Sequence, residues 1–244
     1  MFSSIWKDVR ERFLYGDTVV QLVLINVIVW VGIILLGLPL KAINGGFGAP
    51  NPLVDWLAVP SGGIPLLTRP WTVFTYMFLH EEIFHILFNM LLLYFFGQVL
   101  VNYLGNKRVI PIYVLGGLMG FLFYFVSANF LQEALFGDIG GHMMGASAGV
   151  MAIVMAAALI APLHRFHLIL VGPVQIRYIA FFFILLDILA IQNADPNTGG
   201  SLSHLGGVFL GYLFISQLKK GTDWSVGFNI QLDKFRNLLL TIQD

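Results

Sequence analysis

Three short polar segments stand out in this strongly apolar chain because they carry side chains that can move protons or attack a carbonyl group. They are HEEIFHILFN at residues 80–89, GASAGV at residues 145–150 and SHLGGVFLGY at residues 203–212. A serine is a weak nucleophile until a neighbouring base takes its proton, and a histidine suits that task. Ser147 and His204 are therefore the candidate nucleophile and general base.

The first segment also suggests a zinc site, because a glutamate follows His80 as in the metalloprotease motif HExxH. In that motif the two histidines are four residues apart, whereas His85 follows His80 by five. Five residues on a continuous helix correspond to about 140° of rotation, which is poor geometry for two ligands of one metal ion. The spacing disfavours a metal, although Asp187 keeps an intramembrane metalloprotease as the third alternative.

His85 and Asn89 are four residues apart and so lie on one face of a helix. Acyl transfer needs hydrogen-bond donors directed at the oxyanion that forms when serine attacks a carbonyl group. An imidazole and a side-chain amide are such donors. The structural alternative is that His85 and Asn89 only link neighbouring helices by hydrogen bonds.

The other two segments also have a structural interpretation. GASAG presents small side chains that allow transmembrane helices to approach closely, and Gly207 and Gly211 form a GxxxG face on a later segment. We expect these two small faces to pack together, which would bring His204 next to Ser147. A lone histidine in a membrane helix is a functional candidate, but it can also simply satisfy a neighbouring polar group.

Composition predicts a membrane protein. Of the 244 residues, 58% are hydrophobic and 11% are charged, compared with roughly 25% charged in an average soluble domain. The net charge is zero, with no basic block or motif that indicates nucleic-acid binding. Cysteine is absent, which excludes disulfides, cysteine nucleophiles and thiolate metal sites.

Six apolar segments are long enough to form membrane helices, and we expect helices because lipid cannot satisfy an open sheet edge. They cover residues 19–38, 73–103, 109–128, 145–163, 177–192 and 204–218. We expect an N-terminal tail over residues 1–18 without a cleavable signal peptide, a membrane domain over 19–218 and a C-terminal tail over 219–244. The C-terminal tail contains a weakly amphipathic stretch suited to the membrane surface.

Charge distribution predicts the orientation, because Lys and Arg accumulate on the cytoplasmic side of membrane proteins. Eleven of the 13 lie in the two tails or in the loops after the second and fourth segments. Both termini are therefore expected to be cytoplasmic. Ser147, His204 and the 80–89 segment would then begin their helices on the outer side, where the long Gly- and Pro-rich loop of residues 39–72 also lies.

HxxxxHxxxN, GxSxG and HLGG, in this order on the second, fourth and sixth segments, resemble the rhomboid family of intramembrane serine proteases. The resemblance covers residues 19–218. It implies an all-α bundle of six transmembrane helices whose shorter fourth helix leaves a water-filled cavity, and a Ser147–His204 dyad. His85 and Asn89 would then bind the oxyanion with the Ser147 amide, Gly145 would permit close approach before the serine, and His80 would lie near the cavity.

Two positions depart from the family pattern. Many relatives carry a Trp-Arg pair in the first outer loop, whereas here Trp71 is followed by Thr72, and Met151 stands where an aromatic residue often supports the histidine. A methionine thioether can replace such a contact. Asp187 could orient His204, a role ranked below a plain interhelical hydrogen bond.

The sequence thus predicts an endopeptidase that cleaves single-pass membrane proteins near the outer face of the bilayer. It needs no cofactor, and the predicted location is a bacterial cytoplasmic membrane with the site opening to the extracytoplasmic side. The main alternative is a non-catalytic rhomboid-like protein that binds membrane clients, against which intact Ser147 and His204 argue. A transporter comes second, but no internal repeat or pair of broken helices supports it.

Overall fold

The computed structural model describes residues 17–46, 48–60, 63–136, 141–168 and 170–243. The predicted N-terminal tail, residues 1–18, lies almost wholly outside this part of the chain. The main helices are α2 (Thr18–Ile43), α6 (Ile83–Leu104), α7 (Val109–Val126), α8 (Ser147–Ile160), α9 (Ile176–Gln192), α10 (Thr198–Lys219) and α11 (Trp224–Gln243).

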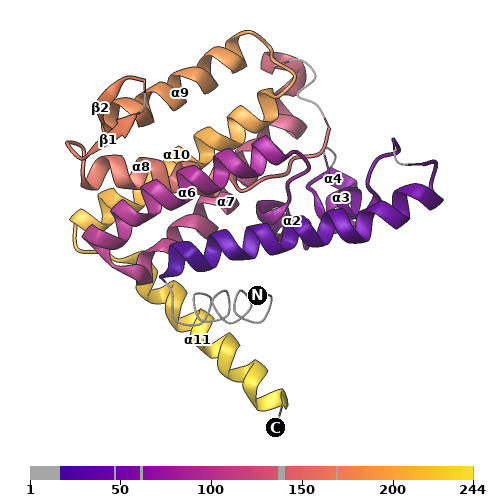
Figure 1. Cartoon of the computed structure of the whole chain (residues 1–244), viewed down its shortest axis with the longest axis horizontal. Coiled ribbons are helices and arrows are strands. Elements are labelled where there is room, and N and C mark those ends of the chain that lie inside the picture. Colours follow the sequence, from indigo (N-terminus) through magenta and orange to yellow (C-terminus); the bar gives the residue numbers. More distant parts are fainter. Residues whose placement is uncertain (1–16, 47, 61–62, 137–140, 169, 244) are drawn as a thin grey trace.

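Shorter elements connect the main helices. They are α3 (Pro52–Leu57), α4 (Gly63–Thr68), α5 (Thr72–Thr75), the 3-10 helices η1 (Tyr76–Phe78) and η2 (Asn106–Arg108), the π-helix η3 (Ser127–Phe136), and the strands β1 (Arg165–Leu168) and β2 (Gly172–Gln175). Helices α3 and α4 form part of the long first loop (Figure 1).

Each of the six predicted membrane segments overlaps a main helix, although α2 extends to Ile43 and α10 begins at Thr198, six residues before the predicted segment. Within the described residues, four helical stretches are long and apolar enough to cross a bilayer: Thr18–Ile43, Ile83–Leu104, Asn106–Leu131 and Thr198–Lys219. Helix α8 is shorter, with 14 residues, and so spans about 21 Å at 1.5 Å per residue. A hydrocarbon core of about 30 Å therefore extends beyond one end of α8, or both.

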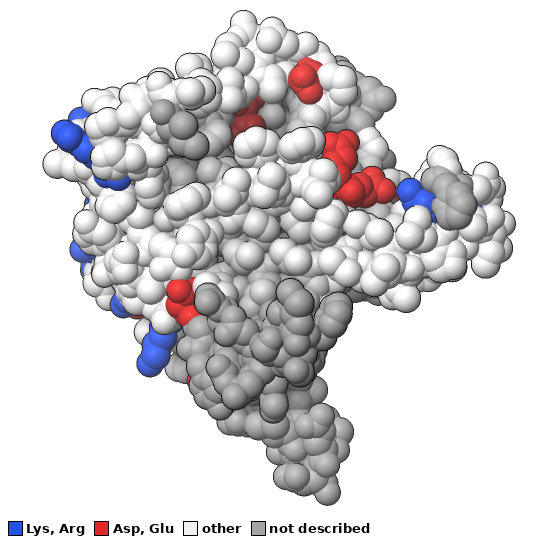
Figure 2. Space-filling view, in the orientation of Figure 1, with Lys and Arg blue, Asp and Glu red and all other residues white. Residues whose placement is uncertain are grey.

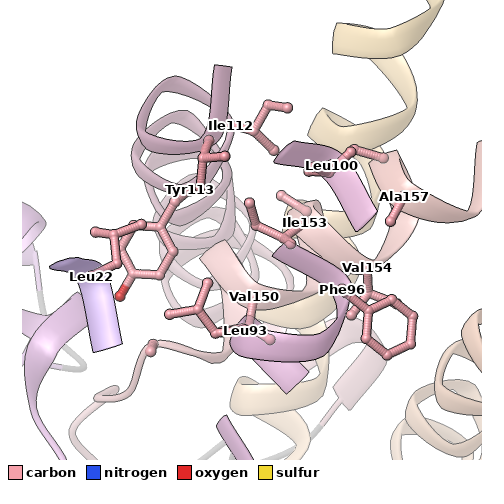
Figure 3. Close-up of a cluster of buried hydrophobic side chains, with 14 of the residues drawn as sticks. Leu22, Leu93, Phe96, Leu100, Ile112, Tyr113, Val150, Ile153, Val154 and Ala157 are labelled. Carbon is pink, nitrogen blue, oxygen red and sulfur yellow. The ribbon is translucent and has the colours of Figure 1, made fainter. Parts of the chain in front are cut away.

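Helix α8 is the centre of the bundle and contacts α6, α7, α9 and α10. It is apolar on all sides, and most of its residues from Ala148 to Ala158 are buried, as expected for a helix surrounded by others. Figure 3 shows part of the buried hydrophobic cluster, in which Val150, Ile153 and Val154 of α8 pack with side chains of α6 and α7.

Glycines set the distance between α8 and α10. A Cβ atom added at Gly207 would overlap the carbonyl oxygen of Ala148, and one at Gly211 would lie 2.5 Å from the carbonyl oxygen of Ala152. The two backbones therefore touch along the GxxxG face. This confirms the predicted packing between the segments that carry Ser147 and His204.

The predicted helix over residues 73–103 is wrong at its N-terminal end. Helical structure ends at Phe78, and α6 begins only at Ile83, with Leu79 and Glu82 in extended conformation. The interruption contains no Pro or Gly. At the interruption, the buried His80 side chain makes a tertiary contact and accepts a hydrogen bond from the Ala146 amide.

The loop between α8 and α9 forms an antiparallel hairpin that the all-α prediction lacked. Strand β1 pairs with β2 from Arg165 opposite Gln175 to Leu168 opposite Gly172. Gly172 has a φ of +84°, which glycine adopts without steric cost. The chain nevertheless remains mostly helical.

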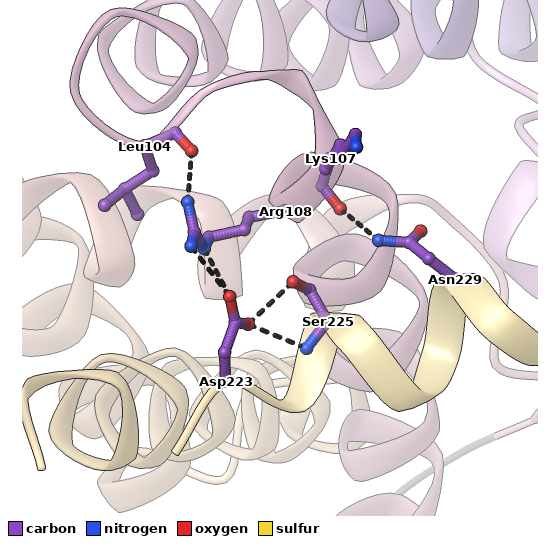
Figure 4. A network of polar contacts seen from close by, with 6 residues as sticks. All are labelled: Leu104, Lys107, Arg108, Asp223, Ser225 and Asn229. Carbon is purple, nitrogen blue, oxygen red and sulfur yellow. Dashed lines mark hydrogen bonds and ion pairs between the residues drawn. The ribbon is translucent and has the colours of Figure 1, made fainter. Parts of the chain in front are cut away.

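The corner between α10 and α11 is tied to the turn after α6 (Figure 4). Arg108 donates from Nε and Nη2 to one carboxylate oxygen of Asp223, at 2.9 and 2.7 Å. The other carboxylate oxygen accepts from the amide and hydroxyl of Ser225. Asn229 donates to the Lys107 carbonyl oxygen, so the start of α11 is fixed while the rest projects from the bundle (Figure 1).

Candidate active site

Ser147 is the first residue of α8, after a turn that is held from two sides. The Gly145 amide donates to the Tyr76 carbonyl oxygen at 2.9 Å, and the Ala146 amide donates to His80 Nε2 at 3.4 Å. The first amides of a helix have no acceptor in the preceding turn. They also lie at the positive end of the helix dipole, so Ser147 is placed where backbone donors can meet negative charge.

His85 lies against this turn. A Cβ atom at Gly145 would be 2.9 Å from both Cε1 and Nε2 of the His85 ring and 3.6 Å from the Ser147 hydroxyl oxygen. Gly145 has a φ of +124°, a conformation that other residues rarely adopt. The glycine thus lets the imidazole of His85 and the hydroxyl of Ser147 approach the same point.

Asn89 lies one turn beyond His85 on α6 and is buried. Its Nδ2 atom donates to the His85 carbonyl oxygen at 2.9 Å. An amide nitrogen carries two hydrogens, so this internal bond leaves the second hydrogen for another acceptor. Asn89 can therefore stay fixed on its helix and still donate into the adjacent cavity.

One cavity of about 420 Å³ connects these side chains. Its polar lining residues come from four helices and their flanking turns: Glu82, His85, Asn89, Ser147, Asp187, Asn197 and His204. Apolar side chains of α6, α8 and α9 complete the wall. The structure thus brings the predicted nucleophile, base and oxyanion donors to a single space.

His204 reaches this cavity from the second turn of α10 and is half-buried. Its Nδ1 atom lies 2.8 Å from Oδ1 of Asp187 on α9, and the two side chains share a hydrogen bond. The sequence ranked a role of Asp187 in orienting His204 below a plain interhelical bond. The structure shows an interhelical hydrogen bond of Asp187, and the residue at its other end is His204.

His80 is placed behind the site, not in the cavity wall. It is fully buried, and its ring packs edge-on against the His85 ring with centroids 4.9 Å apart. The prediction that the two histidines diverge on one helix is wrong because the chain is not helical at His80. Within the described residues, no group of three His, Cys, Asp or Glu side chains is arranged to hold a metal ion.

The two departures from the family pattern have distinct outcomes. Met151 lines the cavity one turn after Ser147, so a thioether occupies the expected position. In the first loop, the Trp71 ring stacks on Trp56 with centroids 5.7 Å apart, and its Nε1 donates to the Trp56 carbonyl oxygen. Arg69 lies over the Trp56 ring and donates to the Asp55 carbonyl oxygen. An arginine and two tryptophans therefore anchor this loop, although the arginine precedes Trp71 and does not follow it directly.

The chain is similar to known proteins. Residues 67–220 match the family described as Rhomboid domain. The chain is 28% identical over 224 residues to RHOMBOID-like protein 12, mitochondrial, of Arabidopsis thaliana, covering 88% of this chain and 62% of that protein. It is 27% identical over 113 residues to Rhomboid protease GlpG of Salmonella newport and of Salmonella typhimurium, covering 46% of this chain and 38% of theirs.

The chain thus spans less than two thirds of the length of these curated relatives. The family match nevertheless includes α6 to α10 and every residue placed around the cavity. Together with the apolar helices, it makes this an integral membrane protein. The chain belongs to the rhomboid family.

Proposed function

We propose that this chain is an intramembrane serine endopeptidase with a Ser147–His204 dyad. The observation that carries the proposal is the shared cavity, which Ser147, His204, His85 and Asn89 all line. Packing alone would explain small residues between α8 and α10, but it would not require a hydroxyl, two imidazoles and an amide around one hollow. The similarity to proteins named as rhomboid proteases supports the same function.

In the proposed reaction, His204 takes the Ser147 hydroxyl proton as the serine oxygen bonds to the scissile carbonyl carbon. The carbonyl π electrons move to oxygen, giving a tetrahedral oxyanion. When that oxyanion collapses, the C–N bond breaks and the leaving nitrogen receives the proton from His204. Water then attacks the acyl-serine ester with His204 as base, releasing the carboxyl product and restoring the Ser147 hydroxyl.

The oxyanion would be bound by the Ser147 backbone amide, Asn89 Nδ2 and the His85 ring. Donors fixed before the reaction stabilise the developing charge without reorganising. His80 contributes indirectly, since its bond to the Ala146 amide holds the turn before the nucleophile. The chemistry needs no cofactor, and the proposed set of catalytic groups contains no metal.

We place all six helices α2 and α6 to α10 across the membrane, with both termini on the cytoplasmic side. On the face in Figure 2, most Lys and Arg side chains lie at the end of the bundle that carries the β1–β2 hairpin, and most Asp and Glu lie toward the other end. Positive residues favour the cytoplasmic side. The cavity, lined by the N-terminal parts of α6, α8 and α10, then opens to the opposite side.

Single-pass transmembrane proteins are the proposed substrates. A helix hides its carbonyl groups in its own hydrogen bonds, so the cleaved segment must unwind and should contain small or helix-breaking residues. We infer that α9 and the loop before α10 move to admit it. The proposed compartment is a bacterial cytoplasmic membrane. Of the similar proteins, one is named as mitochondrial and others are from Salmonella.

The test compares wild-type protein with Ser147→Ala and His204→Ala in liposomes that contain a model single-pass substrate. Ser201→Ala and His167→Ala are matched controls, since neither residue lines the cavity. We expect cleavage by wild type and by both controls, and no detectable cleavage by the two dyad variants. Cleavage that persists in Ser147→Ala would refute the serine mechanism.

The same experiment separates the alternative functions. A client-binding protein without activity would capture the substrate in wild type and in Ser147→Ala alike, and would cleave in neither. A metalloprotease would cleave regardless of Ser147 and lose activity with a chelator. Each result differs from the Ser147-dependent, chelator-resistant cleavage expected here.

A further inference from the structure

The cavity contains an acid that the proposed dyad does not use. Asp187 is 8% exposed, lies in the C-terminal half of α9, and lines the cavity together with Phe183 and Leu186. An isolated carboxylate in such surroundings is costly unless it is paired and hydrogen-bonded. The described partner that satisfies Asp187 is His204.

We infer that Asp187 is a positioning residue that fixes the tautomer and ring orientation of His204, which makes the dyad a functional triad. This inference rests on the proposed function. The carrying observation is the 2.8 Å hydrogen bond between Asp187 Oδ1 and His204 Nδ1. The bond joins two separate helices, α9 and α10, at the cavity in which Ser147 also lies.

A carboxylate can only accept hydrogen bonds, so Asp187 holds the proton of the neutral imidazole on Nδ1. The other ring nitrogen, Nε2, then carries the lone pair and points away from Asp187. Only in this tautomer can Nε2 accept the Ser147 proton. When His204 takes that proton, the carboxylate also stabilises the imidazolium.

The apolar neighbours strengthen this arrangement. Phe183 and Leu186 flank Asp187 on the cavity wall, and a hydrogen bond in low-dielectric surroundings is electrostatically stronger than one in water. Met151 lines the same cavity, but its sulfur is only a weak hydrogen-bond acceptor, so a thioether could not replace the bond that Asp187 makes to His204. Asp187 would thus replace the aromatic support expected from the family pattern.

The kinetic test uses Asp187→Asn, which has nearly the same shape but lacks the charge and can donate to Nδ1 instead of accepting. We expect kcat for a transmembrane substrate to fall roughly 10- to 100-fold, part of the 10²- to 10⁴-fold that general-base catalysis contributes. KM should stay within about twofold, because substrate contacts are unchanged. Asp187→Glu should restore part of the rate.

A control variant and a chemical probe make the comparison specific. Asp55→Asn is the matched control, because Asp55 forms the other described Asp–His pair, with His142 at 3.7 Å and outside this cavity. It should leave kcat unchanged. A small fluorophosphonate probe, which reacts with an activated serine and needs no substrate helix to enter, should label Asp187→Asn more slowly than wild type by a similar factor.

A spectroscopic measurement does not depend on activity. In protein with ¹⁵N-labelled histidine, NMR should show His204 protonated on Nδ1 in wild type and in Ser147→Ala, with the signals assigned by their loss in His204→Gln. Asp187→Asn should shift the population toward the Nε2–H tautomer. A purely structural role of Asp187 would not change this ratio.

The outcomes separate the two proposals. Wild-type His204 protonated on Nε2 would overturn the inference, as would Asp187→Asn with unchanged kcat and tautomer. Loss of cleavage in Asp187→Asn with normal probe labelling would assign Asp187 to substrate entry and also overturn it. If cleavage instead persists in Ser147→Ala, the serine mechanism fails, whatever the tautomer of His204.

Discussion

The imidazole of His85 occupies the space that a side chain at position 145 would need. A Cβ atom there would lie 2.9 Å from two atoms of the ring, closer than real Cβ contacts allow. Glycine is thus required by the backbone conformation and also by the neighbouring ring. Because Ser147 follows two residues later, any change at Gly145 acts on both the proposed oxyanion donor, His85, and the proposed nucleophile.

Gly145→Ala is expected to abolish most of the cleavage activity and to destabilise the fold by about 1–3 kcal/mol, the range for a strained backbone position. The loss follows because either His85 or the turn must move. Cleavage assays and thermal unfolding measure the two effects. Gly141→Ala is the control, since a Cβ atom at Gly141 meets nothing within 4 Å; equal behaviour of the two variants would contradict the geometric argument.

Gly207→Ala should separate α10 from α8, because its new Cβ atom would overlap the Ala148 carbonyl oxygen. We expect a loss of about 1–3 kcal/mol, typical of overpacking in a tight interface. Thermal unfolding in detergent measures it. Gly32→Ala on α2 has open space around it and should be neutral or slightly stabilising. A Gly207→Ala variant as stable as wild type would show that the helices are not in the close contact described.

Asn89→Ala is expected to lower kcat by about 10- to 1,000-fold, the usual cost of removing one oxyanion donor, with little change in KM. Asn129 provides a matched control, because its Nδ2 donates to the Phe125 carbonyl oxygen at 2.9 Å. Asn89 makes the same bond within its own helix, to the His85 carbonyl oxygen at 2.9 Å. Equal rates for Asn89→Ala and Asn129→Ala would leave Asn89 with a helix-stabilising role alone.

The Arg108–Asp223 contact should make the docking of α11 pH-dependent. Burial by itself raises the pKa of the Asp223 carboxyl, but hydrogen bonds from Ser225 and Arg108 outweigh it, so the pKa lies below its ordinary value. A lowered folded-state pKa contributes stability above the ordinary aspartate range, and this contribution is lost as the pH falls through the lowered pKa.

We therefore expect Asp223→Asn to lower the free energy of unfolding near neutral pH by roughly 0.2–1 kcal/mol, as for a surface ion pair, and thermal unfolding at several pH values measures it. The difference from wild type should shrink as the pH decreases from about 7 to 3, across the ordinary aspartate pKa. Asp233→Asn, at an exposed position on α11, is the control. A difference that grows toward acid pH would contradict the assigned direction.

The helical fold and much of the site could be inferred from residue types and spacing. Long apolar segments require helices, and the GxxxG face of α10 predicted the packing that the structure confirms at Gly207. The interruption at His80 could not be inferred, because no Pro or Gly marks it and the contact that His80 makes there is a hydrogen bond to Ala146, 66 residues away in sequence.

The hairpin was missed for a similar reason. Residues 165–175 form a short link between two helices and mix apolar residues with Arg165, His167 and Gln175. Their residue types did not indicate that one half of this link would pair with the other. In the first loop, the sequence showed that the usual Trp-Arg pair is absent, but not that Arg69, Trp56 and Trp71 would assemble an equivalent anchor. Such contacts depend on the path of the loop, which local sequence does not specify.

By itself the sequence determined a helical membrane protein and the residue types of the proposed serine-protease site, since helical periodicity and side-chain chemistry are local properties. The tertiary structure decided which side chains meet. It placed His80 behind the site because the chain turns there, and it paired Asp187 with His204 because α9 and α10 bring them within 2.8 Å. Distances between helices arise from packing across the whole bundle, so they cannot be read from the residue spacing within one segment.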